Sequence, residues 1–171
     1  MNFNSCPYQA GAFAFSPNPD PPPILSNNPA ELRISAFKQL TAYPNYGNPS
    51  RNADILYTGN RGTWTIDIPA YLLTPGRVRG QLIIRAVLDD NISVPVNLYS
   101  ATITVNDSIV HTGRLPLEHG TPVGGIFTNW RDLTFSVPLR RAARVTIVNT
   151  STTGASEWIG LDWMELRLFA G

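Results

Sequence analysis

The run "EWIGLDWMELRLF", residues 157–169, decides the fold of this chain. It is heavily apolar, yet Asp162 and Glu165 lie inside it. Apolar residues at both odd and even positions are typical of a central strand that is covered on both faces. Residues three apart in a strand point to opposite faces, so these two carboxylates are not expected to flank one bond. The run therefore predicts a final β-strand instead of the acid pair of an active site.

Short segments with alternating apolar residues recur from residue 31 onward, separated by turn residues. The expected strands lie at 63–69, 77–88, 97–105, 132–139 and 144–150. Asn106-Asp107 stands between two β-rich pieces, a pattern typical of a two-residue hairpin. Residues 29–41, "PAELRISAFKQLT", could form a helix or a first strand.

The spacing of these strands is that of an all-β protein. Irregular loops are expected at 41–62, 89–96, 113–129 and 150–157. Short strands with such loops between them predict an antiparallel jelly-roll β-sandwich, whose loops collect at the ends of the sheets and carry function there. We expect one sandwich domain over residues 31–171.

Residues 1–30 form a different segment, an extended proline-rich arm. The stretch "FSPNPDPPPILSNNP" has six prolines in 15 residues, which excludes a helix or a central strand. A solvated linker would not need apolar side chains, so we expect the arm to lie on its own domain or on another copy. The residues expected to serve assembly are Cys6, Phe13, Phe15, Ile24 and Leu25.

Composition excludes several classes of partner. Thirteen basic against 12 acidic residues leave a net charge of +1, which argues against nucleic acid as a partner. No apolar run approaches the roughly 18 residues of a membrane span, so no membrane insertion is expected. Cys6 is the single cysteine, which excludes an internal disulfide and leaves a bond between chains open. A secretory signal is not apparent at the N-terminus.

Catalytic motifs are absent from the sequence. Its two histidines, His111 and His119, are not part of a zinc signature, and no serine lies in a GxSxG elbow. We therefore expect no enzymatic activity and no catalytic residues. No cofactor is expected either, although loop carboxylates and carbonyls could hold calcium.

Sugar recognition fits the loop residues better. Proteins bind sugars with aromatic rings that stack on the apolar face of the pyranose and with amides, carboxylates and arginines that hold its hydroxyls. Residues of these types in loop-like contexts are Tyr57, Asn129, Trp130, Arg131 and Asn149. For Trp130, a core position and a sugar platform are equally compatible with the pattern.

The order of motifs resembles the galactose-binding-like carbohydrate-binding modules of families 6 and 35. The resemblance covers about residues 59–169 and rests on their order: "GNRGTW", "GQLIIRA", "ATITVND", "GGIFTNWRDLTFSVPL", "ARVTIVN" and "WIGLDWMELRLF". It implies that Trp130 is the aromatic that stacks on sugar and that Asn149 is a loop amide of the site. It also implies that Asp162 is the last-strand acid that helps to hold a structural calcium in some members.

Two functions follow from these observations. The first is a non-catalytic carbohydrate-binding, lectin-like domain whose partner is a glycan or polysaccharide. The second is a self-assembling structural subunit of an extracellular fibre, a spore or cell-surface layer, or a virion, joined to other copies through the arm. Both predict a location outside the cell or on the surface of a cell, spore or virion.

Overall fold

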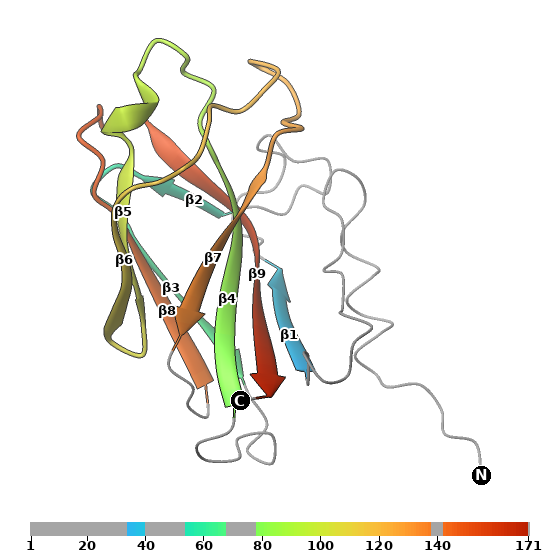
Figure 1. Ribbon diagram of the computed structural model, residues 1–171. Helices are drawn as coiled ribbons and strands as arrows, with labels where there is room; N and C mark the ends of the chain where they lie inside the picture. Colours follow the sequence, from blue (N-terminus) through green and yellow to red (C-terminus); the bar gives the residue numbers. More distant parts are fainter. Residues whose placement is uncertain (1–33, 40–53, 68–77, 138–141, 171) are drawn as a thin grey trace.

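The computed structural model describes residues 34–39, 54–67, 78–137 and 142–170. Two β-sheets pack face to face in these ranges, as Figure 1 shows. The expected arm lies outside the described residues, together with Cys6, Phe13, Phe15, Ile24 and Leu25. In the described part, no helix is long and apolar enough to cross a membrane.

The larger sheet has five strands and is built around the closing run of the sequence. That run forms β9, Trp158–Ala170, which pairs on one side with β4, Val78–Leu88. On its other side β9 pairs with β1, Ile34–Gln39, and then with β2, Asp54–Tyr57. The strand β7, Arg131–Val137, lies beyond β4, and every pairing is antiparallel. The closing run is thus a central strand, as predicted.

The smaller sheet has four antiparallel strands in the order β3-β8-β5-β6. These strands are β3, Arg61–Asp67; β8, Ala142–Asn149; β5, Ser100–Val105; and β6, Ser108–Arg114. A short 3₁₀ helix, η2, Val96–Leu98, leads into β5. Asn106 and Asp107 have positive φ values of 50° and 69°, as the predicted two-residue hairpin between β5 and β6 requires.

The core lies between the sheets and contains the predicted faces of the strands. Leu82, Ile84, Ala86 and Leu88 of β4 are fully buried there. Burying one such aliphatic side chain contributes about 1.5 to 3 kcal/mol, so the inner faces hold the two sheets together. The prediction of an all-β jelly-roll sandwich is confirmed.

Two local expectations are decided by the pairing with β9. The segment 29–41 contains strand β1 and not a helix, because its residues 34–39 pair with the C-terminal half of β9. The expected loop 41–62 contains β2, a strand of four residues. A strand this short shows little alternation in the sequence and is defined here by its partner.

A β-bulge in β9 overturns the expectation that Asp162 and Glu165 point to opposite faces. Arg85 of β4 lies opposite Trp163, but the next residue of β4, Ala86, lies opposite Leu161. Asp162 is therefore the extra residue of a bulge, which shifts the alternation by one position. Both acids consequently face outward, away from the other sheet.

The hairpin gives a test of backbone strain. Asp107→Val and Asp107→Gly both remove the exposed pair between the Asp107 carboxylate and Arg144, whose atoms lie 2.7 Å apart. Both replacements must adopt the φ of 69° at this position, which strains a β-branched side chain but not glycine, so valine should cost about 1–2 kcal/mol more than glycine in the free energy of unfolding. Urea denaturation measures the difference, and equal losses in the two variants would contradict it.

Candidate ligand site

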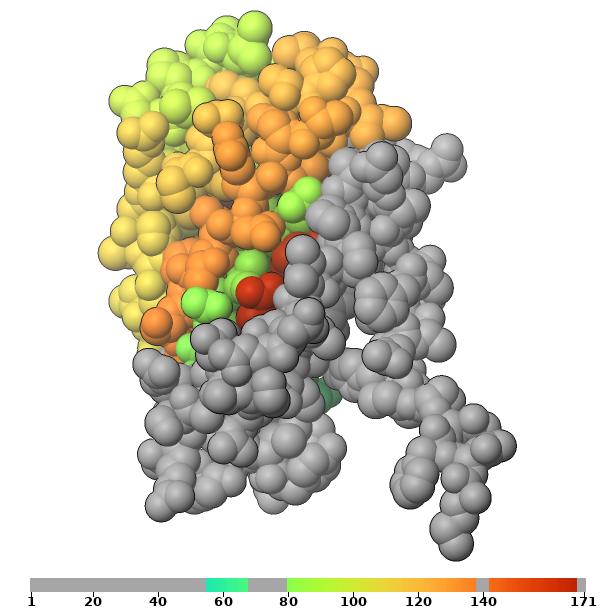
Figure 2. All heavy atoms as spheres, turned by 45° about the vertical axis from the view of Figure 1, so that its right-hand side comes forward, coloured from blue at the N-terminus to red at the C-terminus, as the bar shows by residue number. Residues whose placement is uncertain are grey.

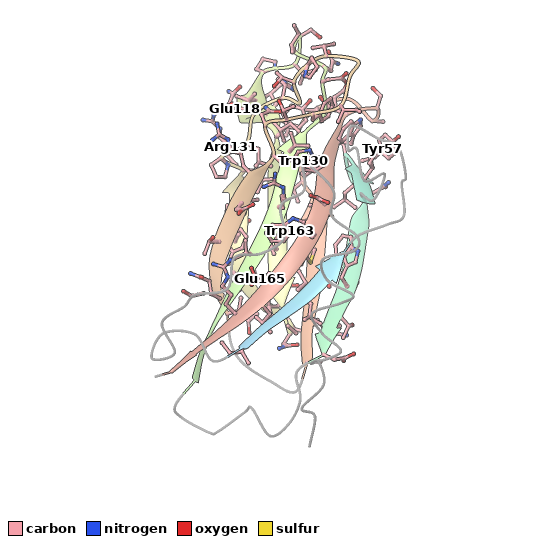
Figure 3. The ribbon with its side chains drawn as sticks, turned by 90° about the vertical axis from the view of Figure 1, so that its right-hand side faces the viewer. Tyr57, Glu118, Trp130, Arg131, Trp163 and Glu165 are labelled. Carbon is pink, nitrogen blue, oxygen red and sulfur yellow. The ribbon has the colours of Figure 1, made fainter. Side chains whose placement is uncertain are left out.

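An aromatic cluster lies at one end of the outer face of the five-stranded sheet. Phe127, Trp130 and Trp158 form it together with two aliphatic side chains, Ile55 and Val87. The rings of Phe127 and Trp158 are nearly parallel, with centroids 6.1 Å apart and an interplanar angle of 11°. Tyr57 packs against the cluster from β2, and Figure 3 shows Tyr57 and Trp130 near the same end of the sheet.

Gly160 of β9 provides the space for two of these rings. A Cβ atom at this position would lie 3.0 Å from the Trp158 ring and 3.4 Å from the Trp130 ring. The same atom would lie 3.2 Å from a methyl group of Val87. A glycine inside a strand normally weakens it, and here it allows aromatic side chains to approach the backbone closely.

Trp130 lies in the cluster with its ring largely covered. Only 6% of the residue is exposed, and no residue in the described ranges accepts a hydrogen bond from its buried indole N–H. Of the two readings of Trp130, the structure favours the core position. Tyr57 is only partly buried, so it is the member of this group that presents ring surface to a ligand.

Arg131 lies at the start of β7, beside the cluster and open to solvent. Its Nη2 atom is 3.4 Å from Oε2 of Glu118, and the two side chains are 56% and 66% exposed. Such an exposed pair is worth at most about 1 kcal/mol, so its members are easily redirected to other partners. Figure 2 shows this face, on which only small areas of β4 and β9 are visible beside β7.

The amide of Asn129 connects two parts of the loop that precedes β7. Its Oδ1 accepts a hydrogen bond from the backbone N–H of Thr121 at 2.9 Å. Its Nδ2 donates to the backbone oxygen of His119 at 2.7 Å. Asn129 thereby fixes the chain just ahead of Trp130 and Arg131.

Asn149 is fully buried, so its amide is not presented to solvent as a loop amide would be. Its Nδ2 donates to the backbone oxygen of Leu56 at 2.8 Å, and its Oδ1 accepts from the backbone N–H of Ser151 at 3.0 Å. A buried amide with both ends bonded contributes to structure. Asn149 therefore holds the strand residue next to Tyr57.

Asp89, at the end of β4, is a buried acid whose role the sequence did not reveal. Its carboxylate accepts hydrogen bonds from the Tyr99 hydroxyl at 2.9 Å and from the backbone N–H of Trp158 at 2.8 Å. It also accepts one from the backbone N–H of Asn91 at 3.1 Å. Burial and the Asp89 carboxylate raise the pKa of Tyr99 well above its usual range, which keeps the hydroxyl protonated as a donor. The sequence signal was an aspartate directly after an apolar strand.

The two outward acids of β9 lie beside arginines. Asp162 Oδ2 is 3.4 Å from Nε of Arg85, and Glu165 Oε2 is 2.8 Å from Nη2 of Arg167. Figure 3 shows Glu165 and Trp163 on the face that carries the cluster. A guanidinium cannot ligate a cation, and the described residues include no group of three or more His, Cys, Asp or Glu side chains that could hold a metal. The surroundings of Asp162 therefore do not fit the calcium ion that the resemblance implies.

Comparison with known proteins finds likeness in structure alone. No protein-family model matches the chain, and no curated protein matches it. The CBM36-1 domain of a multidomain xylanase from the hindgut metagenome of Trinervitermes trinervoides is 10% identical with a TM-score of 0.48, over 78% of this chain and 96% of that one. A family 35 carbohydrate-binding module from an environmental isolate is 12% identical with a TM-score of 0.45, over 85% and 94%.

A third similar structure is a larger protein. The insecticidal delta-endotoxin Cry8Ea1 from Bacillus thuringiensis is 14% identical with a TM-score of 0.49, over 70% of this chain and 20% of the toxin. A carbohydrate-binding module of family 35, one of the two families whose motifs the sequence resembles, is thus among the similar structures.

Gly160 tests the architecture of the cluster. Gly160→Val should place a branched side chain against Trp158 and Trp130 and destabilise the fold by about 1–3 kcal/mol, the usual cost of overpacking. Urea unfolding measures the loss, and near-ultraviolet circular dichroism reports the aromatic packing. Gly160→Ala should show a smaller effect of the same sign. An unchanged aromatic signal in both variants would mean that the rings do not rest on this glycine.

Proposed function

We propose that this protein is a non-catalytic, lectin-like carbohydrate-binding β-sandwich, displayed outside the cell or on a cell, spore or virion surface. The observation that carries the proposal is the aromatic cluster at the end of the five-stranded sheet, with Tyr57 partly exposed on one side and Arg131 exposed on the other. An aromatic ring next to hydrogen-bonding side chains is the combination that recognises a sugar.

The width of this region favours a chain of sugars over a single one. Tyr57 lies on β2 and Arg131 on β7, with β9 and β4 between them. Three strand spacings separate β2 from β7, about 14 Å in all. A ligand that touches both side chains must cross the cluster, which suits an oligosaccharide or polysaccharide.

The five predicted residues take two roles in this proposal. Tyr57 stacks on the apolar face of a sugar ring, and Arg131 donates hydrogen bonds to its hydroxyl groups once it leaves Glu118. Three residues hold these two side chains in place. Asn129 fixes the chain ahead of Arg131, Asn149 bonds the strand residue next to Tyr57, and Trp130 belongs to the cluster on which Tyr57 packs. The proposed site requires no calcium ion, because its two contacting groups are the ring of Tyr57 and the guanidinium of Arg131.

A glycan array with the intact protein, followed by calorimetry on the best oligosaccharide, tests the proposal. Tyr57→Ala and Arg131→Ala should each weaken binding about tenfold, since a stacked ring or a charged hydrogen bond contributes about 1.4 kcal/mol. Arg114→Ala is the matched control, because Arg114 is also exposed but lies at the end of β6 in the other sheet. It should bind as the unaltered protein does.

Two outcomes would reject this function. One is the absence of binding to every glycan on the array. The other is equal binding by Tyr57→Ala, Arg131→Ala and Arg114→Ala, which would place any sugar site elsewhere.

Assembly into a larger structure is the second candidate, and an exposed apolar patch favours it. Ile92, Val123 and Ile126 are 53–69% exposed on two loops at one end of the sandwich. The backbone N–H of Gly124 donates to Oδ2 of Asp90 at 2.7 Å, which joins these loops. Exposed aliphatic side chains on two joined loops are candidates for an interaction surface.

Light scattering distinguishes the two modes of assembly. If other copies bind through the proline-rich arm, the full chain should form large particles and a chain lacking residues 1–30 should stay monomeric. A triple change of Ile92, Val123 and Ile126 to Ser should disperse the particles only if the apolar patch is the interface. A monomeric full chain at high concentration would reject assembly by either route.

A further inference from the structure

The outer face of the five-stranded sheet carries buried apolar side chains beyond the aromatic cluster. Ile83 of β4 and Trp163 of β9 point outward, because their chain neighbours Leu82 and Met164 face the core. Ile83 and Trp163 are each only 3% exposed. One face of an antiparallel sheet is commonly in contact with water, so the burial of these two side chains requires a cover.

Charged side chains on the same face are buried as deeply. Glu165 is fully buried beside Arg167, and Arg85 is 9% exposed beside Asp162. Charged groups are seldom removed from water in this way unless partners surround them. Beyond these pairs, at least one further interaction partner contacts each of four residues at this place, namely Arg85, Asp162, Trp163 and Glu165. Additional groups therefore meet the middle of this face.

The described strands and loops do not supply this cover. In the described ranges the strands form only the two sheets, and the aromatic cluster belongs to the end of the face near Gly160. Only small areas of β4 and β9 are visible on this face in Figure 2. Because the side chains are buried in a single copy of the chain, we expect the cover to come from the same chain.

The proline-rich arm enters the sheet beside this face. It precedes β1, whose first residue, Ile34, lies opposite Leu168 of β9. Trp163 is five residues before Leu168, a distance of about 17 Å at the usual rise of a strand. Leu25 is nine residues before Ile34, and a polyproline II segment of that length extends about 28 Å. The apolar pair Ile24-Leu25 can therefore reach Trp163.

The chemistry of the arm matches that of the face. The stretch "PDPPPIL", residues 19–25, combines four prolines with two aliphatic side chains. Proline-rich segments bind to aromatic surfaces at a low cost in conformational entropy, and Trp163 supplies such a ring. Their backbone carbonyls make no internal hydrogen bonds. The guanidinium of Arg167 is 26% exposed and has more N–H groups than Glu165 uses, so it can donate to a carbonyl of the arm.

We propose that the middle of the outer face of the five-stranded sheet is the docking surface for the chain's own proline-rich arm, with Ile24 and Leu25 packed against Trp163 and Ile83. Residues 1–33 are the longest stretch outside the described ranges. An arm bound in this way is not free to join other copies, which leaves the exposed apolar patch of the loops as the route to assembly. The inference goes beyond sugar binding and does not depend on it.

A nitroxide spin label on the arm of the full chain tests the docking. Cys6 is the single cysteine, so Ser26→Cys in a Cys6→Ser background places one label next to Leu25. The label broadens the nuclear magnetic resonance signals of nearby protons. The indole N–H signal of Trp163 should lose most of its intensity. The indole of Trp64, on β3 in the other sheet, is the internal reference and should lose much less.

Two results of this measurement would overturn the proposal. The first is a Trp163 signal that stays as sharp as that of Trp64, which would mean that another segment, such as residues 40–53 or 68–77, lies on the face. The second comes from an equal mixture of spin-labelled chains and isotope-labelled chains without a nitroxide. Broadening of Trp163 in this mixture would assign the face to the arm of another copy.

Paired substitutions in the arm give an independent test that leaves every strand residue unchanged. Ile24→Ser with Leu25→Ser should lower the melting temperature of the full chain by roughly 5 °C, because two aliphatic side chains are no longer buried on the face. Acrylamide should also quench its tryptophan fluorescence more strongly. Asn27→Ser with Asn28→Ser is the matched control and should behave as the unaltered protein does. Equal melting temperatures and equal quenching in the two variants would overturn the docking of Ile24 and Leu25.

Discussion

The pairing of β9 with its three neighbours is the constraint on which the larger sheet depends. β9 joins β4 to β1 and β2, so every strand of this sheet is attached to it directly or through β4. Its inner side chains fill the core, and its outer side chains carry the aromatic cluster and the arginine pairs. A strand that must serve two faces has to be apolar on both, which explains the composition of the closing run.

Buried polar groups connect the loops at one end of the sandwich. The Asp89 carboxylate accepts bonds from Asn91 and Tyr99 of the β4–β5 connection and from the backbone of Trp158 in β9. His119 of the β6–β7 loop contacts the same connection at the backbone oxygen of Val94. Low dielectric surroundings strengthen such bonds and make the loss of any one costly. At the same end of the molecule, the loops therefore contain both buried, hydrogen-bonded residues such as Asp89 and exposed residues such as Ile92 and Ile126.

The fold could be predicted from the sequence because it depends on alternation, which is a local property. The β4 face of Leu82, Ile84 and Ala86 and the Asn106-Asp107 turn were both visible in this way. The site was less predictable because it depends on burial and register. Distant residues decide whether Trp130 is covered and which backbone oxygen the Asn149 amide bonds. The bond from the backbone of Trp158 to Asp89 likewise joins residues 69 positions apart in the chain.

The bulge at Asp162 has a consequence for how this family of sequences should vary. Before the bulge the inward residues of β9 are odd-numbered, as Ile159 and Leu161 are, and after it they are even-numbered, as Met164 and Leu166 are. The two halves of the strand are thus out of phase by one residue. Single substitutions leave this phase intact. Loss or gain of one residue between Leu161 and Met164 would instead make the side chains of one half of the strand point to the opposite face of the sheet. Homologues should therefore tolerate changes of side chain at this position far better than changes of length.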